Sequence, residues 1–196
     1  MTEPRPSNLN VPNVLTVLRI IMVPLFVVVL FWQPANQGWR FITTGIFVAA
    51  MLTDLADGYI ARRYNLITDF GKLWDPIADK ALTGAAFISL SLLGELPWYF
   101  TVLILVREWG ITWLRAAIAK YGIMAANRGG KLKTVTQSLA LIVFLAWLPG
   151  LPGAVQFLAW VLMWAALILT LVTGADYIRE AIRIRARGKQ PRRSAE

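Results

Sequence analysis

The sequence predicts an all-α integral membrane protein with six transmembrane helices, and two observations lead to this fold class. Of the 196 residues, 57% are hydrophobic and 16% are charged, whereas a soluble domain is about 45–50% apolar and about 25% charged. The second observation is a series of six apolar segments, each near the roughly 20 residues that a helix needs to cross a bilayer. We expect spans at about 14–32, 41–61, 75–93, 98–119, 133–148 and 155–177.

Basic residues alternate between the connecting segments, and this alternation predicts the orientation of the chain. Lys and Arg occur in every second connection and in the tail, and they are absent from the connections at 33–39, 94–97 and 149–153. Because short loops rich in Lys and Arg stay in the cytoplasm, we expect both termini and the loops at 62–74 and 120–133 to be cytoplasmic.

The net charge of +9 follows from the same pattern. We divide the chain into one membrane domain at 1–178 and a basic cytoplasmic tail at 179–196, which begins as a helix continuing from the sixth span. Basic segments next to a membrane bind anionic lipids. We therefore expect the positive charge to serve orientation and lipid contact, and we expect no nucleic-acid partner.

The chain contains no His and no Cys. Their absence excludes disulfides, thiol nucleophiles, Ser-His-Asp catalysis and sites for zinc, haem or iron–sulfur clusters. Any metal would have to be held by oxygen ligands, which suits hard cations such as Mg²⁺, Mn²⁺ or Ca²⁺.

Five of the 11 acidic residues lie in one short stretch, at Asp54, Asp57, Asp69, Asp75 and Asp79. The first two are three residues apart at the inner end of the second span, and the last two are four residues apart at the start of the third. Both spacings place two carboxylates on one helix face. We expect Asp69 to be a solvated loop residue, out of phase with the others.

The two pairs should lie at the same depth, in the cytoplasmic third of the membrane. At about 1.5 Å per residue, Asp54 and Asp57 are roughly 20–24 Å from the outer end of their span. Four facing carboxylates repel one another unless cations are bound, and four Asp side chains suit a pair of divalent metal ions. The alternative is a set of polar helix ends, in which Asp75, which precedes Pro76, is simply an N-cap.

The spacing of these residues resembles the signature of the CDP-alcohol phosphotransferase family. The matching stretch is Asp54-x2-Asp57-Gly58-x2-Ala61-Arg62-x8-Gly71-x3-Asp75-x3-Asp79, eight positions over 26 residues. The resemblance implies a homodimeric six-helix enzyme of a bacterial cytoplasmic membrane. Such an enzyme binds two Mg²⁺ or Mn²⁺ ions, transfers a phosphatidyl or similar group from a CDP-linked donor to an alcohol, and releases CMP.

The resemblance also assigns roles to single residues. It implies that Asp54, Asp57, Asp75 and Asp79 hold the metal ions and that Asp79 is the catalytic base. It implies a site for the CDP donor, CDP-diacylglycerol, formed by Asp57, Gly58, Ala61, Arg62 and Gly71. Small side chains at Gly58 and Ala61 let a ligand lie against the helix backbone, although they also suit plain helix packing.

Further cations lie inside the predicted spans, and they point to an anionic acceptor. Arg107 and Arg115 lie on similar faces of the fourth span, and Lys131 and Lys133 lie near the start of the fifth. Basic residues in a membrane are functional candidates by default. A structural ion pair, for instance between Arg107 and Glu108, is the alternative.

The segments that flank the signature resemble the bacterial branch of the same family whose acceptor is sn-glycerol 3-phosphate. They are Asn10-Val11-Pro12-Asn13-x2-Thr16-x2-Arg19, Arg107-Glu108 with Arg115, and Gly130-Lys131-x-Lys133-Thr134-x2-Gln137. The resemblance implies that the acceptor phosphate is bound by Arg107, Arg115, Lys131 and Lys133, and it brings Asn13, Thr16 and Arg19 close to the active site.

Two alternatives stay open at this point. An acceptor such as inositol phosphate also needs a cluster of cations. A cation-binding transporter would also need buried carboxylates, but the sequence shows no broken helix or inverted repeat. The fixed spacing of Gly58 and Arg62 would have no role in such a transporter.

Overall fold

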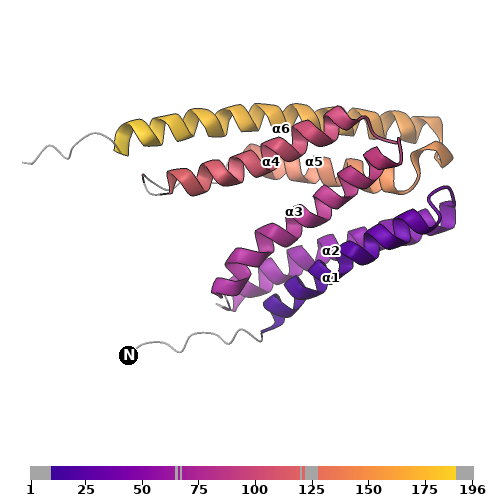
Figure 1. The fold of residues 1–196 in the computed structure, drawn as a ribbon, viewed down its shortest axis with the longest axis horizontal. Coiled ribbons are helices and arrows are strands. Elements are labelled where there is room, and N and C mark those ends of the chain that lie inside the picture. Colours follow the sequence, from indigo (N-terminus) through magenta and orange to yellow (C-terminus); the bar gives the residue numbers. More distant parts are fainter. Residues whose placement is uncertain (1–9, 65, 67, 120, 122–127, 189–196) are drawn as a thin grey trace, which may run out of the picture. The chain divides into compact units, whose positions relative to one another are not determined.

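The computed structural model describes residues 10–64, 66, 68–119, 121 and 128–188. Every regular element in this part of the chain is helical, which confirms the predicted all-α class (Figure 1). In chain order the elements are α1 (Val11–Trp32), α2 (Gln37–Arg63), α3 (Asp69–Leu92), α4 (Trp98–Ile118), α5 (Arg128–Leu145), the short 3₁₀ helix η1 (Leu148–Gly150) and α6 (Gly153–Gly188).

The third helix begins six residues before the predicted start at residue 75. The Thr68 side chain accepts a hydrogen bond from the Gly71 N–H and caps α3, so the helix starts at Asp69. The expectation that Asp69 is a loop residue was therefore wrong, and so was the alternative that Asp75 is an N-cap. Pro76 lies inside the helix.

The fifth helix ends before its predicted bound, and the sixth continues into the tail as predicted. We expected the fifth span at 133–148, but α5 ends at Leu145, because Trp147 takes a left-handed conformation with φ 64° and η1 follows. The sixth helix continues to Gly188 and includes the first part of the basic tail. The rest of the tail, 189–196, lies outside the described residues.

The chain divides into two compact units. Unit one comprises residues 1–97 and 141–159, and unit two comprises 98–140 and 160–196. In unit one, α1 contacts both α2 and α3, and Phe26 of α1 lies against Phe47 of α2 with ring centroids 5.8 Å apart. Helix caps set the starts of these helices, since Asn10 and Asn36 accept hydrogen bonds from the first turns of α1 and α2.

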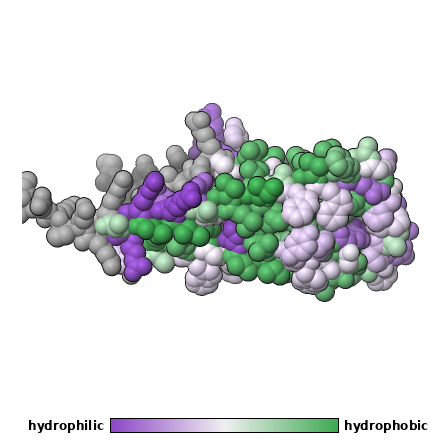
Figure 2. Space-filling model, turned by 90° about the horizontal axis from the view of Figure 1, so that it is seen from above, coloured by the Kyte–Doolittle hydropathy of each residue, from purple (hydrophilic) through white to green (hydrophobic). Residues whose placement is uncertain are grey.

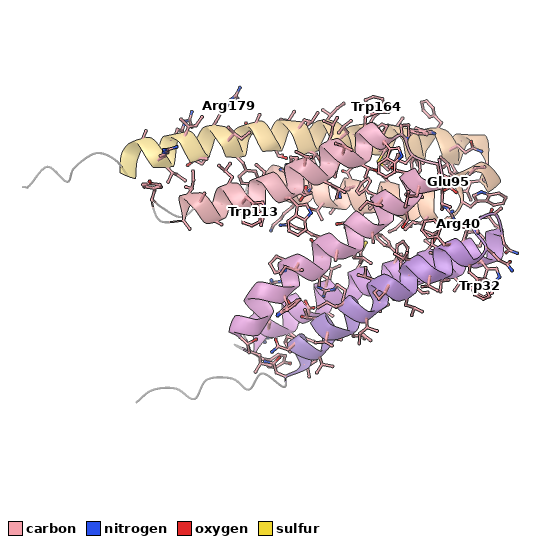
Figure 3. All side chains as sticks on the ribbon, in the orientation of Figure 1. Trp32, Arg40, Glu95, Trp113, Trp164 and Arg179 are labelled. Atoms are coloured by element: carbon pink, nitrogen blue, oxygen red, sulfur yellow. The ribbon has the colours of Figure 1, made fainter. Side chains whose placement is uncertain are left out.

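A buried ion pair ties together one end of unit one. Arg40 of α2 is fully buried and makes two hydrogen bonds to the carboxylate of Glu95, at 2.9 and 2.6 Å. The same guanidinium donates to the carbonyl oxygens of Phe144 and Leu145. Figure 3 shows Arg40 and Glu95 lying together. The last carbonyl groups of a helix have no hydrogen-bond donor within it. Arg40 therefore also supplies hydrogen bonds to the carbonyl groups at the end of α5.

Unit two contains α4, most of α5 and most of α6. Aromatic rings join α4 to α6, with Phe100 4.9 Å from Trp164 and 6.1 Å from Trp160 between centroids. The exposed side chains of α6 between residues 160 and 172 are apolar: Val161, Trp164, Ile168, Leu171 and Val172. Figure 2 shows strongly hydrophobic side chains over the middle of the visible face.

Among the described residues, three helices are long and apolar enough to cross a membrane by length and composition: α1, α2 and the part of α6 at Gly153–Ala186. Of the other long helices, α3 carries Asp75 and Asp79, α4 carries Arg107 and Glu108, and α5 carries basic residues in its first two turns. The finding supports a helical membrane protein. The number of spans and their orientation stay predictions.

Candidate active site at the ends of three helices

The start of α1, the end of α2 and the start of α3 lie at the same end of unit one (Figure 1). A pocket of about 170 Å³ opens between them. Five residues of the family signature line it, together with residues of α1 and of the segment before α3; the lining residues are Pro12, Asn13, Gly58, Ala61, Arg62, Leu66, Thr68, Gly71 and Asp75. Residues far apart in the sequence are thus brought to one cavity.

Hydrogen bonds join the start of α1 to the start of α3. Besides capping α3, the hydroxyl of Thr68 donates to Oδ1 of Asn13 at 2.9 Å, and Asn10 donates to the carbonyl of Leu66 at 3.3 Å. Both Asn13 and Thr68 are buried. These contacts fix one wall of the pocket.

Two glycines let polar groups approach closely. A Cβ atom on Gly58 would lie 3.3 Å from the guanidinium of Arg62, and one on Gly71 would lie 3.2 Å from Oδ1 of Asn13 and 3.5 Å from Oδ2 of Asp75. Side chains at these positions would therefore narrow the pocket or push its polar groups apart.

Asp54 and Asp57 hold a buried cation supplied by α1. The fully buried guanidinium of Arg19 lies 2.7 Å from Oδ1 of Asp54 and is also paired with Oδ2 of Asp57. Asp57 is itself buried, whereas the Asp54 side chain is 37% exposed. The i,i+3 spacing thus places both carboxylates on one face of α2, as expected.

Asp75 comes from α3 and faces the same group. The hydroxyl of Thr16 donates to Oδ1 of Asp75 at 2.5 Å, and Asp75 lies close enough to Asp54 and Asp57 to repel both electrostatically. Asp79 is half-buried one turn further along α3. In the described part of the chain, no three acidic side chains converge as a ready metal-binding group.

The predicted acceptor residues belong to unit two, where two of them are engaged. Lys133 lies 2.5 Å and Arg107 3.0 Å from the same oxygen of Glu108. Arg107 also donates to the carbonyl of Thr170 and to the hydroxyl of Thr173. The ion pair considered as an alternative for Arg107 is therefore present.

The other two predicted acceptor residues are exposed. The guanidinium of Arg115 lies 4.6 Å from the ring centroid of Tyr177, and that of Arg107 lies 5.7 Å from the same centroid. Lys131 is exposed at the start of α5.

Sequence reasoning missed Pro12, Leu66 and Thr68 as pocket residues. Thr68 had a recognisable signal, since a Thr that precedes the first turn of a helix is a preferred N-cap. Pro12 and Leu66 had none, because their place in the pocket depends on how α1 meets the segment before α3.

Comparison with known proteins identifies the relatives of this chain. The sequence model of the family described as CDP-alcohol phosphatidyltransferase matches residues 9–172. A Mycobacterium tuberculosis protein named "Probable phosphatidylglycerophosphate synthase" is 47% identical over 175 residues, which cover 89% of this chain and 82% of the relative.

Two further relatives carry different names. A Bacillus subtilis protein named "CDP-diacylglycerol--glycerol-3-phosphate 3-phosphatidyltransferase" is 37% identical over 181 residues, covering 86% of this chain and 93% of the relative. A rice protein named "Cardiolipin synthase (CMP-forming)" is 38% identical over 161 residues, covering 73% of this chain and 47% of the relative. On the family match and these identities, the chain belongs to the CDP-alcohol phosphatidyltransferase family.

Proposed function

We propose that this protein transfers the phosphatidyl group of CDP-diacylglycerol to sn-glycerol 3-phosphate, giving phosphatidylglycerophosphate and CMP in phospholipid biosynthesis. The observation that carries the proposal is the similarity over almost the whole chain to relatives named for this reaction. The pocket supports it, because its lining includes Gly58, Ala61, Arg62, Gly71 and Asp75 of the family signature.

The pocket is proposed to bind the CDP part of the donor. Its volume of about 170 Å³ is smaller than the roughly 300–1,000 Å³ of pockets that enclose a whole drug-sized ligand, so it suits one portion of the donor. Gly58 and Ala61 offer a surface without large side chains. Arg62 is exposed at the rim of the pocket and can bind a phosphate through its guanidinium fork.

The residues present fit a divalent cation. Their donors are carboxylate oxygens, which Mg²⁺ and Mn²⁺ prefer, and the pairing of Asp54 and Asp57 with Arg19 shows that these carboxylates attract positive charge. We propose that Asp54, Asp57, Asp75 and Asp79 hold two such ions. When bound, the ions would offset the negative charge of the donor diphosphate.

Asp79 is proposed to act as the base. It would accept the proton of the acceptor hydroxyl as that oxygen attacks the phosphorus of the phosphatidyl group. The bond from this phosphorus to the bridging oxygen breaks, and CMP leaves with the electron pair. Because such transition states are loose, the proton can move late, which suits a weak base such as a carboxylate.

The acceptor phosphate is proposed to bind Arg107, Arg115, Lys131 and Lys133. Arg115 and Lys131 are exposed, and they supply the donors that a phosphate needs. Arg107 and Lys133 share the single carboxylate of Glu108, so the three groups together retain a positive charge.

For the whole protein we propose six membrane spans with the active site facing the cytoplasm, in a bacterial cytoplasmic membrane. The alternation of basic loops supports this orientation. We also propose a homodimer, on the family resemblance, and contact of the basic end of α6 with anionic lipids, on its charge.

The test is an acceptor series with the purified chain in detergent. CDP-diacylglycerol is supplied with Mg²⁺ or Mn²⁺, and CMP release is measured with glycerol 3-phosphate, inositol phosphate, serine and phosphatidylglycerol in parallel. We expect release with glycerol 3-phosphate and little with the others. Release only with inositol phosphate, or only with phosphatidylglycerol, would overturn the proposed acceptor. No release with any of the four acceptors would overturn the proposed reaction.

A further inference from the structure

Arg19 is the buried cation of the acidic site, and it comes from a helix outside the family signature. Its side chain is 0% exposed, and it contacts both Asp54 and Asp57 of α2. The signature residues all lie on α2, α3 and the segment between them, so α1 adds a charge that the signature does not contain.

The hydrogen bonding of Arg19 is incomplete. Among the described residues, its Nε atom is buried without a hydrogen-bond partner, whereas its NH1 atom lies 2.7 Å from Oδ1 of Asp54. Buried donors without partners are rare in native proteins because each costs free energy. Arg19 is therefore not held here by a full set of contacts, unlike Arg40, whose guanidinium binds Glu95 and two backbone carbonyls.

The charge at this site is also unbalanced. One guanidinium faces two carboxylates, and Asp75 adds a third negative charge that repels both. The carboxylates are thus partly neutralised by Arg19 and still favour further positive charge.

We propose that Arg19 is a built-in counter-cation, which holds Asp54 and Asp57 together before metal binds and competes with the divalent cation for their oxygens. A carboxylate oxygen in contact with a guanidinium is not free to ligate, and a cation brought beside Arg19 would be repelled by it. A divalent cation would therefore bind either against the repulsion of Arg19 or after Arg19 has moved away from one of the carboxylates. This inference rests on the metal ions of the proposed function.

The experiment measures Mn²⁺ binding by titration calorimetry on the full chain in detergent, with thermal unfolding in chelator and in saturating Mn²⁺. We expect Arg19→Gln to lower the Kd for Mn²⁺ by about tenfold or more, because a competing charge is removed. We also expect its melting temperature to fall in chelator and to rise more on Mn²⁺ addition than that of the wild type.

Two further variants serve as controls for charge and for the loss of a buried arginine. Arg19→Lys keeps the positive charge but lacks the two-pronged guanidinium group, so it should fold readily. It should bind Mn²⁺ with an affinity between those of the wild type and Arg19→Gln. Arg40→Gln removes an equally buried arginine of the same unit; it should lower the melting temperature and leave the Mn²⁺ affinity unchanged.

The outcomes separate the two proposals. Unchanged or weaker Mn²⁺ binding in both Arg19 variants, while the wild type binds Mn²⁺ and forms CMP, would overturn the competition and leave the proposed function standing. A wild type that forms CMP but binds no Mn²⁺ would overturn both the metal site and the role of Arg19.

Discussion

Gly58 is a pocket residue at which a methyl group can be added to test donor binding. A Cβ atom there would lie 3.3 and 3.4 Å from the two terminal nitrogens of Arg62. Because Arg62 is exposed, its guanidinium can move aside without disturbing the core. The cost of an added methyl group should therefore appear in donor binding rather than in folding.

We expect Gly58→Ala to lower kcat/KM for CDP-diacylglycerol about tenfold, the effect of one methyl group in a binding pocket, with little change in melting temperature. Gly45→Ala is the matched control, since Gly45 lies on the same helix with nothing within 4 Å of an added Cβ. It should stabilise α2 by up to about 1 kcal/mol and leave kcat/KM unchanged. Equal kinetics in the two variants would contradict the placement of the donor against Gly58.

A substitution of Arg115 tests the proposed acceptor site in the same way. Arg115→Ala should raise the KM for glycerol 3-phosphate about tenfold or more, the loss of one charged hydrogen bond, while the KM for CDP-diacylglycerol changes little. Arg183→Ala is the control, because Arg183 is also exposed and only distantly paired, with Glu180 at 4.0 Å. Equal effects on both substrates would show that Arg115 does not bind the acceptor.

For single residues, the sequence predicted which carboxylates share a helix face, but it did not predict which side chains they contact. The spacing of Asp54 and Asp57 was sufficient to place them on one helix face, because that follows from helix geometry alone. Their pairing with Arg19 could not be predicted in the same way. It depends on how α1 and α2 pack, which brings together residues at least 35 positions apart.

At the scale of elements, the start of α3 determines how the pocket is built. Thr68 caps the helix through Gly71 and reaches Asn13 of α1 with the same hydroxyl. One side chain therefore both starts α3 and joins it to α1. The predicted start at residue 75 missed this, because the apolar stretch begins later than the helix does.

Thr68→Ala should cost about 1 kcal/mol of stability, as the loss of an N-cap does, and should also raise the KM for the CDP donor by loosening the wall of the pocket. Thr68→Ser keeps the hydroxyl and should retain both properties. The measurements are thermal unfolding and initial-rate kinetics on the three chains. A normal donor KM in Thr68→Ala would mean that the contact with Asn13 does not shape the site.

At the scale of the whole molecule, composition and loop charge predicted an all-α membrane protein, and the structure has helices throughout its described residues. Within the part of the chain that the structure describes, length and apolar composition alone qualify α1, α2 and most of α6 as spans. The remaining long helices carry charged residues such as Asp75 and Arg107, so their membrane placement depends on what those charges contact. Local sequence does not contain that information.

The absence of native Cys makes the topology directly testable with single-cysteine variants. We expect an impermeant maleimide to label three exposed positions in intact cells, Ala35→Cys, Pro97→Cys and Ala154→Cys. Tyr64→Cys and Ala119→Cys should react only after permeabilisation. Labelling of Tyr64→Cys in intact cells would contradict the predicted alternation of loops and the cytoplasmic active site.

The proposed reaction is tested most directly by the amount of CMP formed from CDP-diacylglycerol and glycerol 3-phosphate in the presence of Mg²⁺ or Mn²⁺. We expect CMP and phosphatidylglycerophosphate in equal amounts from the wild type. We expect none above background from Asp57→Asn, which loses a proposed metal ligand and whose folding is checked by its melting temperature. Asp176→Asn, at an exposed acidic position on α6, should match the wild type. Full activity in Asp57→Asn, or no CMP from the wild type, would contradict the proposed reaction at this site.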